Sequence, residues 1–224
     1  MEEKKYELTD EIIQRYIQGE TKTFHRIKAL KDFGNVKKGD LGGFIEKEYN
    51  LSHDDECWIS GNAMVFDNAM VFDNAVISGN SRVHGDAVIS ENAVVTEYSN
   101  VFEHAEICEN ATISGSAMIY GDTIVGNYAT INEDGHLVSN RDYIAINNIG
   151  PKYDNDSINR DDVITIFKSY NNSIQAVSPF FKGGTIYEFR NKIRELFDDD
   201  SIYLREYFLA MDLAMLHMGF QLKD

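Results

Sequence analysis

Residues 59–137 read ISGNAMVFDNAMVFDNAVISGNSRVHGDAVISENAVVTEYSNVFEHAEICENATISGSAMIYGDTIVGNYATINEDGHL, and an aliphatic residue recurs there at every sixth position. Four residues after most of these positions stands Ala, Ser or Thr, and the two residues before it are mostly Gly, Asn, Asp or Glu. The aliphatic series is Ile59, Val65, Val71, Ile77, Val83, Ile89, Val95, Val101, Ile107, Ile113, Ile119, Val125, Ile131 and Leu137.

A period of six excludes an amphipathic helix, which needs apolar residues three and four positions apart. Each repeat instead supplies one short strand and one corner, where Gly and Asn tolerate a left-handed backbone. Three repeats then close a triangular coil of eighteen residues. The pattern predicts a mainly β protein, a left-handed parallel β-helix of about four to five coils over residues 59–137. Its coils depend on their neighbours, so both ends need caps.

The N-terminal segment, residues 1–58, is predicted to be one cap. Leu8-Thr9-Asp10-Glu11-Ile12-Ile13 is interpreted as the start of a short helix, and the stretch from Phe24 to Phe33 as a strand. Ile45 and Leu51 are expected to point inward from a first, irregular coil.

The C-terminal segment, residues 138–224, is predicted to be an α+β cap domain. Strands are expected over residues 143–149, 163–168 and 174–177, with a hairpin turn at residues 171–172. Thr185-Ile186-Tyr187-Glu188 is a capping box that begins a helix ending near Phe197, and Ser201 begins a second helix. The second helix is expected to bury a broad apolar face, formed by Leu204, Phe208, Met211, Met215 and Met218.

The net charge of −16 is concentrated in the repeats. Residues 51–140 hold fourteen acidic residues and one basic residue, Arg82, whereas residues 1–50 are neutral. Such a surface repels nucleic acid phosphates and favours basic partners. No apolar run is long enough to span a membrane, and no signal-peptide pattern is present, so we expect a cytoplasmic location.

The unbroken hexapeptide pattern resembles the hexapeptide-repeat left-handed β-helix superfamily. Many members are acyltransferases that form trimers and bind acyl-coenzyme A between subunits; others have no known activity. This resemblance implies the fold and favours a homotrimer. Because one fold hosts many functions, it does not assign an activity.

The flanking segments resemble uncharacterised hexapeptide-repeat proteins of phages and prophages from Gram-positive hosts. The similar segments are residues 26–33 (RIKALKDF), residues 39–43 (GDLGG) and residues 180–185 (FFKGGT) followed by the two helices. The resemblance implies a phage protein acting in the host cytoplasm.

The predicted triangular coils stack into a prism. Outward side chains eighteen residues apart then lie above one another on the same face of this prism. Phe66, His84, Phe102 and Tyr120 form one stripe of this kind. Aligned aromatic rings are unusual on a solvated face. We therefore predict an interface, either between subunits or beneath the C-terminal domain.

A second column places Asp73, Glu91 and Glu109 on one corner, beside an asparagine ladder of Asn74, Asn92 and Asn110. Stacked carboxylates repel one another, which favours either a bound cation or basic partner side chains. Splayed, solvated carboxylates are the alternative.

Histidine decides whether the chain could be an enzyme, because the acyltransferases of the superfamily that it resembles use one as a general base. His84 is the candidate base. The histidine spacing does not suggest a zinc site, and we expect no metal and no cofactor. The leading hypothesis is a non-catalytic phage interaction protein that binds a host macromolecule, with counter-defence as one version. A coenzyme A-dependent acyltransferase is the alternative.

Overall fold

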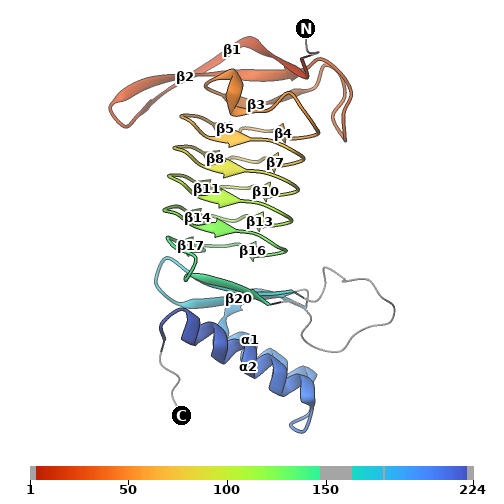
Figure 1. The fold of residues 1–224 in the computed structure, drawn as a ribbon, viewed down its shortest axis with the longest axis vertical. Coiled ribbons are helices and arrows are strands. Elements are labelled where there is room, and N and C mark those ends of the chain that lie inside the picture. The colour runs from red at the N-terminus through yellow and green to blue at the C-terminus, as the bar shows by residue number, and fades with distance from the viewer. Residues whose placement is uncertain (1–3, 147–162, 179, 221–224) are drawn as a thin grey trace.

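The computed structural model describes residues 4–146, 163–178 and 180–220. The repeats form a parallel β-solenoid of about five turns, capped at one end by antiparallel strands and at the other by a small sheet with two helices (Figure 1). The predicted mainly β fold with a parallel coil is confirmed.

The coil is built from fourteen two-residue strands, each ending on one residue of the aliphatic series. They are β4 (Trp58–Ile59), β5 (Met64–Val65), β6 (Met70–Val71), β7 (Val76–Ile77), β8 (Arg82–Val83), β9 (Val88–Ile89), β10 (Val94–Val95), β11 (Asn100–Val101), β12 (Glu106–Ile107), β13 (Thr112–Ile113), β14 (Met118–Ile119), β15 (Ile124–Val125), β16 (Thr130–Ile131) and β17 (His136–Leu137).

Each strand from β4 to β14 pairs in parallel with the strand one coil further on, so that Val95 lies between Ile77 and Ile113. Three sheets result. The orders of their two-residue strands are β5-β8-β11-β14-β17, β16-β13-β10-β7-β4 and β15-β12-β9-β6, and strands of the N-terminal cap extend the first sheet at β5. The second residue of every two-residue strand is fully or almost fully buried and belongs to one continuous apolar core. Ile45 and Leu51 lie inside the first, irregular coil as predicted.

The predicted N-terminal helix is wrong. Residues 8–13 lie within strand β1 (Tyr6–Ile17), which forms an antiparallel hairpin with β2 (Glu20–Ala29). Gln18 and Gly19 connect them with φ values of 51° and 91°, as a tight hairpin turn of the primed kind requires. The β-branched Ile12 and Ile13 suit this strand, and pairing with β2 overrides the helix-start signal. Strand β2 also begins and ends earlier than the predicted range of residues 24–33.

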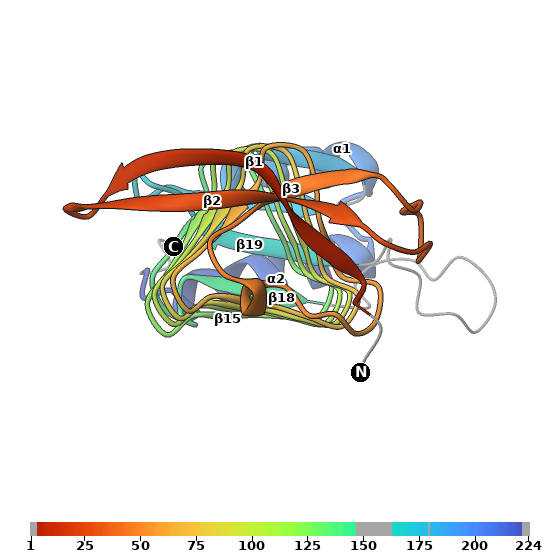
Figure 2. The same cartoon turned by 90° about the horizontal axis from the view of Figure 1, so that it is seen from above.

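Strand β3 (Leu41–Ile45) joins the hairpin to the coil, pairing with β2 on one side and with β5 on the other. A 3-10 turn, η1 (Glu48–Asn50), follows it. Seen from above, the hairpin lies across the end of the prism and extends past its outline (Figure 2).

At the other end, four antiparallel strands form a sheet in the order β18 (Tyr143–Ile146), β19 (Ile164–Lys168), β20 (Ile174–Ser178) and β21 (Phe181–Thr185). The first three match the predicted strands, except that residues 147–149 lie outside the described residues. Strand β21 was not predicted, because Gly183 and Gly184 give it no strand-like pattern.

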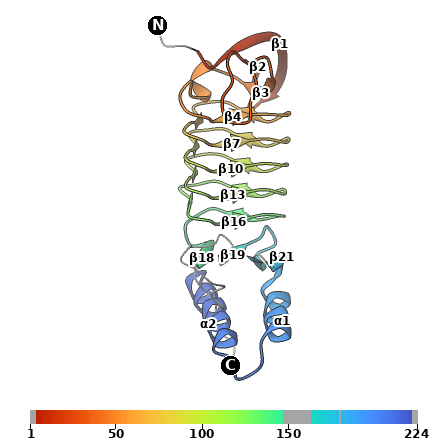
Figure 3. The same cartoon turned by 90° about the vertical axis from the view of Figure 1, so that its right-hand side faces the viewer.

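Helices α1 (Ile186–Leu196) and α2 (Ile202–His217) begin where the sequence predicted, after N-caps Thr185 and Ser201. They pack on the side of this sheet that faces away from the prism, α2 beneath β18 and α1 beneath β21 (Figure 3). The predicted face of α2 is buried at Leu204, Met211 and Met218 and half-buried at Phe208 and Met215. No helix in the described part of the chain is long and apolar enough to cross a membrane.

Candidate functional site

The four predicted stripe residues stack face to face in one column. Ring centroids lie 4.7 Å apart between Phe66 and His84, 5.1 Å between His84 and Phe102, and 4.8 Å between Phe102 and Tyr120. The ring planes differ by 10° or less. Each ring directly follows strand β5, β8, β11 or β14, so the spacing of paired strands sets the spacing of the rings.

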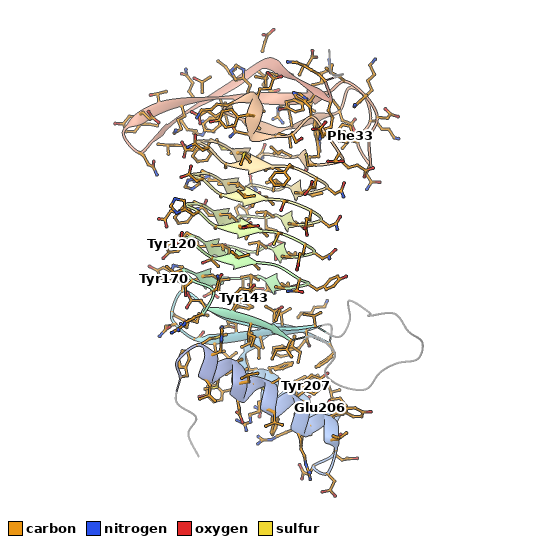
Figure 4. The ribbon with its side chains drawn as sticks, in the orientation of Figure 1. Phe33, Tyr120, Tyr143, Tyr170, Glu206 and Tyr207 are labelled. Atoms are coloured by element: carbon orange, nitrogen blue, oxygen red, sulfur yellow. The ribbon has the colours of Figure 1, made fainter. Side chains whose placement is uncertain are left out.

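The column is longer than the sequence predicted. Phe24 of the hairpin packs edge-on against Phe66, at 5.4 Å. At the other end His136 packs against Tyr120 at 5.3 Å, and Tyr170 packs against His136 at 5.4 Å. Tyr120 and Tyr170 stand on the same edge of the molecule (Figure 4). We call these seven rings the aromatic column.

Exposure changes along the aromatic column. Phe24 and Phe66 are buried under the N-terminal hairpin, His84, Phe102 and Tyr120 are half-buried, and Tyr170 is 74% exposed. The C-terminal sheet lies at the end of the prism, and Tyr170, in the turn between β19 and β20, packs against His136 at the end of the column. Phe102 is stacked on both faces, by His84 and Tyr120, so its exposed part is its edge. Tyr120 stacks on Phe102, and its hydroxyl lies 3.1 Å from His136 Nε2.

A group of charged side chains surrounds the buried end of the column. The Lys22 ammonium lies over Phe66 and forms ion pairs with Asp67, with Glu20 at 2.8 Å and with Glu46 at 3.6 Å. Burial raises the pKa of Asp67, but hydrogen bonds from Lys22 and from the Gly85 backbone N–H outweigh it, so this pKa lies below its usual value. The ion pairs fix the hairpin to the prism.

The depressed pKa of Asp67 makes the stability pH-dependent. The folded state favours the charged carboxylate of Asp67. The stabilisation that this carboxylate provides is therefore fully present above its unfolded pKa of about 4 and is lost as pH falls through its lower folded pKa. We expect Asp67→Asn to reduce the melting temperature at pH 7 and to flatten its decline below about pH 4. Thermal melts of both proteins across this range test the expectation. An equally steep acid decline in the variant would show that other carboxylates cause it.

The surroundings of His84 suit packing within the column better than the role of a general base. Its ring lies between Phe66 and Phe102, and Nδ1 is 3.9 Å from an oxygen of Asp67, beyond hydrogen-bond length. Burial lowers its pKa, against the opposing effect of Asp67. Three surface cavities, of about 610, 270 and 170 Å³, are lined by other residues. None of these three cavities is lined by His84. Its role as a general base stays a prediction.

An acyl-coenzyme A site would also need cations for the phosphates of the cofactor, and Arg82 is the one basic residue between positions 51 and 140. We expect no heat of binding with acetyl-coenzyme A at concentrations up to about millimolar, which corresponds to roughly −4 kcal/mol. Saturable heat that disappears in His84→Ala or Arg82→Ala would restore the acyltransferase hypothesis.

The acidic corner forms hydrogen bonds with the backbone. Asp73, Glu91 and Glu109 all have φ values of 55°, in the left-handed region. The Asp73 carboxylate accepts a hydrogen bond from the Glu91 backbone N–H at 3.0 Å, and Glu109 accepts one from Asn127. The predicted asparagine ladder is present beside them, with Asn74 donating to Asn92 at 3.3 Å and Asn92 donating to Asn110 at 3.5 Å.

The same bond recurs at other corners of the prism. Glu97 accepts from Gly115 N–H at 2.7 Å, and Glu103 accepts from Gly121 N–H at 3.0 Å. In each case the carboxylate accepts from the corner residue eighteen positions further on. Because these carboxylates satisfy backbone donors, Asp73 and Glu109 of the acidic corner have a structural role that needs no cation.

We therefore expect Glu103→Ala to lower the free energy of unfolding by about 1 kcal/mol, the usual net value of one hydrogen bond. Urea denaturation measures this change, with Glu106→Ala as a control that removes a carboxylate from a strand face.

Millimolar calcium should leave the melting temperature of the wild-type protein unchanged. A rise that Glu91→Gln abolishes would establish a cation site instead.

Within residues 4–146, 163–178 and 180–220, no group of three or more His, Cys, Asp or Glu side chains is placed to hold a metal ion. The half-buried Cys108 does not form an activated thiol, because burial and neighbouring acids, chiefly Glu106 and Glu109, raise its pKa to about 11. A thiolate nucleophile is therefore not available there near neutral pH.

The sequence was also compared with known proteins. No family model matches the chain, and no curated protein matches it. The fold and the geometry of the aromatic column are therefore the observations on which a function can be proposed.

Proposed function

We propose that this protein is a non-catalytic interaction protein that holds a partner protein along the aromatic column. The observation that carries the proposal is the column itself, whose rings at His84, Phe102 and Tyr120 are stacked in advance and half-exposed. Rings held by their neighbours lose little conformational freedom when a partner binds, which is the usual property of binding hot spots.

The charges beside the column indicate what kind of partner fits. The neighbouring corner carries Asp86, Glu103 and Asp122, all exposed, and the prism as a whole is strongly acidic. A partner with apolar side chains against the ring edges and Lys or Arg at the rim would match this surface. Nucleic acid and acidic cofactors would be repelled.

The finer parts of the proposal come from the resemblances in the sequence. We infer a left-handed winding from the hexapeptide spacing, and a homotrimer from the same superfamily. The flanking segments support a phage accessory protein whose partner is a host macromolecule in the cytoplasm, with interference in host defence as one version.

Affinity purification from extracts of a Gram-positive host tests the proposal. The wild-type protein is compared with Phe102→Ser plus Tyr120→Ser, and with a control, Val88→Ser plus Val94→Ser, on the other two sheets of the prism. We expect one host protein to co-purify with the wild type and the control and to be lost with the ring variant. Equal recovery by all three, or no specific recovery, would contradict the proposal.

Light scattering on the same proteins shows whether the column binds a different protein or joins two copies of this chain. If the column binds a partner, the mass of the ring variant equals that of the wild type. If the mass falls while the variant stays folded, the column joins subunits, and the proposed partner surface is wrong.

A further inference from the structure

Helix α2 is apolar on two opposite sides. One side, with Leu204, Met211 and Ala214, is buried against the C-terminal sheet and α1. The other side is exposed and has four large apolar residues, with exposed fractions of 64% for Ile202, 68% for Leu209, 56% for Leu213 and 55% for Leu216. A helix that is apolar all round is normally covered on both sides.

The four exposed residues form one narrow stripe. At about 100° per residue they fall within roughly 60° of the helix circumference. Ile202, Leu209 and Leu216 recur every seven residues, the spacing with which a helix contacts another helix lying alongside it. The stripe therefore suits a helical partner along most of α2, and Figure 3 shows α2 at the end of the molecule opposite the N-terminal hairpin.

Two charges accompany the stripe along one edge. Arg205 lies beside its first half and Asp212 beside its second half, seven residues apart. Neither side chain forms an ion pair within the described part of the chain. Their separation along one helix is about 10 Å, which is too far for them to pair with each other.

We propose that α2 binds α2 of a second copy of this chain, antiparallel and related by a two-fold axis near Leu209. In this arrangement the charged edge of one α2 lies against the same edge of the other α2. Arg205 of each chain then meets the partner's Asp212, which gives two ion pairs. Leu209 packs on its own copy, and Ile202 packs between Leu213 and Leu216 of the partner.

Charge complementarity selects this partner and this direction. A parallel pair would face each charged edge with the opposite edge, so that Arg205 would meet Glu206 but Asp212 would meet Leu213 and lose its match. A contact with anionic lipid is disfavoured, because Asp198, Asp199 and Asp200 directly precede α2. The contact is two-fold, so it doubles the number of chains in whatever assembly the prism itself forms.

Light scattering over a dilution series tests the contact. We expect an even multiple of the 25.5 kDa chain for the wild type and half that mass for Leu209→Glu. Tyr187→Glu, on the exposed side of α1, is the control and should keep the wild-type mass. Because Leu209 is exposed, circular dichroism and the melting transition should show that the variant remains folded.

Charge reversal tests the pairing independently of the apolar stripe. Arg205→Asp alone and Asp212→Arg alone should each weaken association at least about tenfold, because each creates like-charge pairs. The double reversal should restore association, since each chain again offers opposite charges to its copy. A wild-type mass that Leu209→Glu leaves unchanged would overturn the contact. A double reversal as weak as the single ones would overturn the antiparallel pairing.

Discussion

Val95→Asp should lower the free energy of unfolding by more than about 4 kcal/mol, because it places an unpaired charge inside the prism. Val95 is fully buried in the continuous apolar core of the prism, in a column between Ile77 and Ile113. Each coil is stabilised by its neighbours, so the loss at one level also removes support from the next. Ile113→Asp, one coil further on, should have an effect of the same size.

The residue just before each of these provides a matched control. Val94 and Thr112 belong to the same strands but point outward and are half-buried. Val94→Asp and Thr112→Asp add the same charge to the same acidic prism and should cost about 1 kcal/mol or less. Urea denaturation of the four variants gives the comparison. Similar midpoints within each pair would contradict an inward-facing column.

Lys5→Met should cost about 3 kcal/mol, the second-largest effect expected. The Lys5 side chain is fully buried, and its ammonium donates to the carbonyl oxygens of Asp54, at 2.9 Å, and Cys57, at 3.0 Å. It also contacts the Cys57 Sγ at 3.1 Å and lies over the Phe33 ring. Methionine keeps the apolar stem but leaves these buried acceptors without a donor.

The adjacent lysine is the control. Lys4 is 59% exposed and pairs with Glu48 at the surface, so Lys4→Met should cost less than about 1 kcal/mol. Denaturation monitored by the fluorescence of Trp58, which lies in the same core, reports both variants. Equal costs would mean that the Lys5 bonds do not hold the N-terminal cap on the prism.

The sequence predicted what the repeat itself determines. A coil of eighteen residues aligns positions eighteen apart, so the core series, the four stacked rings and the asparagine ladder all follow from spacing alone. The same spacing stacked Asp73, Glu91 and Glu109, but it did not predict the hydrogen bonds that the Asp73 and Glu109 carboxylates accept from the backbone N–H one coil further on. These bonds depend on the direction of the corner N–H, which is set by a φ value that spacing does not give.

The caps were predicted less well, because their positions depend on contacts between distant segments. Residues 8–13 carry a helix-start signal, yet pairing with β2 makes them a strand; Gln18-Gly19 between two strand-like runs was the signal for a hairpin. Phe24 and Tyr170 reach the column only through the folding of both caps. His136 joins it sixteen residues after Tyr120, outside the eighteen-residue spacing.

The most direct test of the central claim is site-specific photo-crosslinking in cells of the proposed Gram-positive host. A photoreactive phenylalanine analogue replaces Phe102 in the aromatic column, or Val94 on another sheet of the prism as the control. Recognition along the column predicts one adduct with a host protein from position 102 and none from position 94. The same adduct from both positions, or an adduct from position 94 alone, would contradict it.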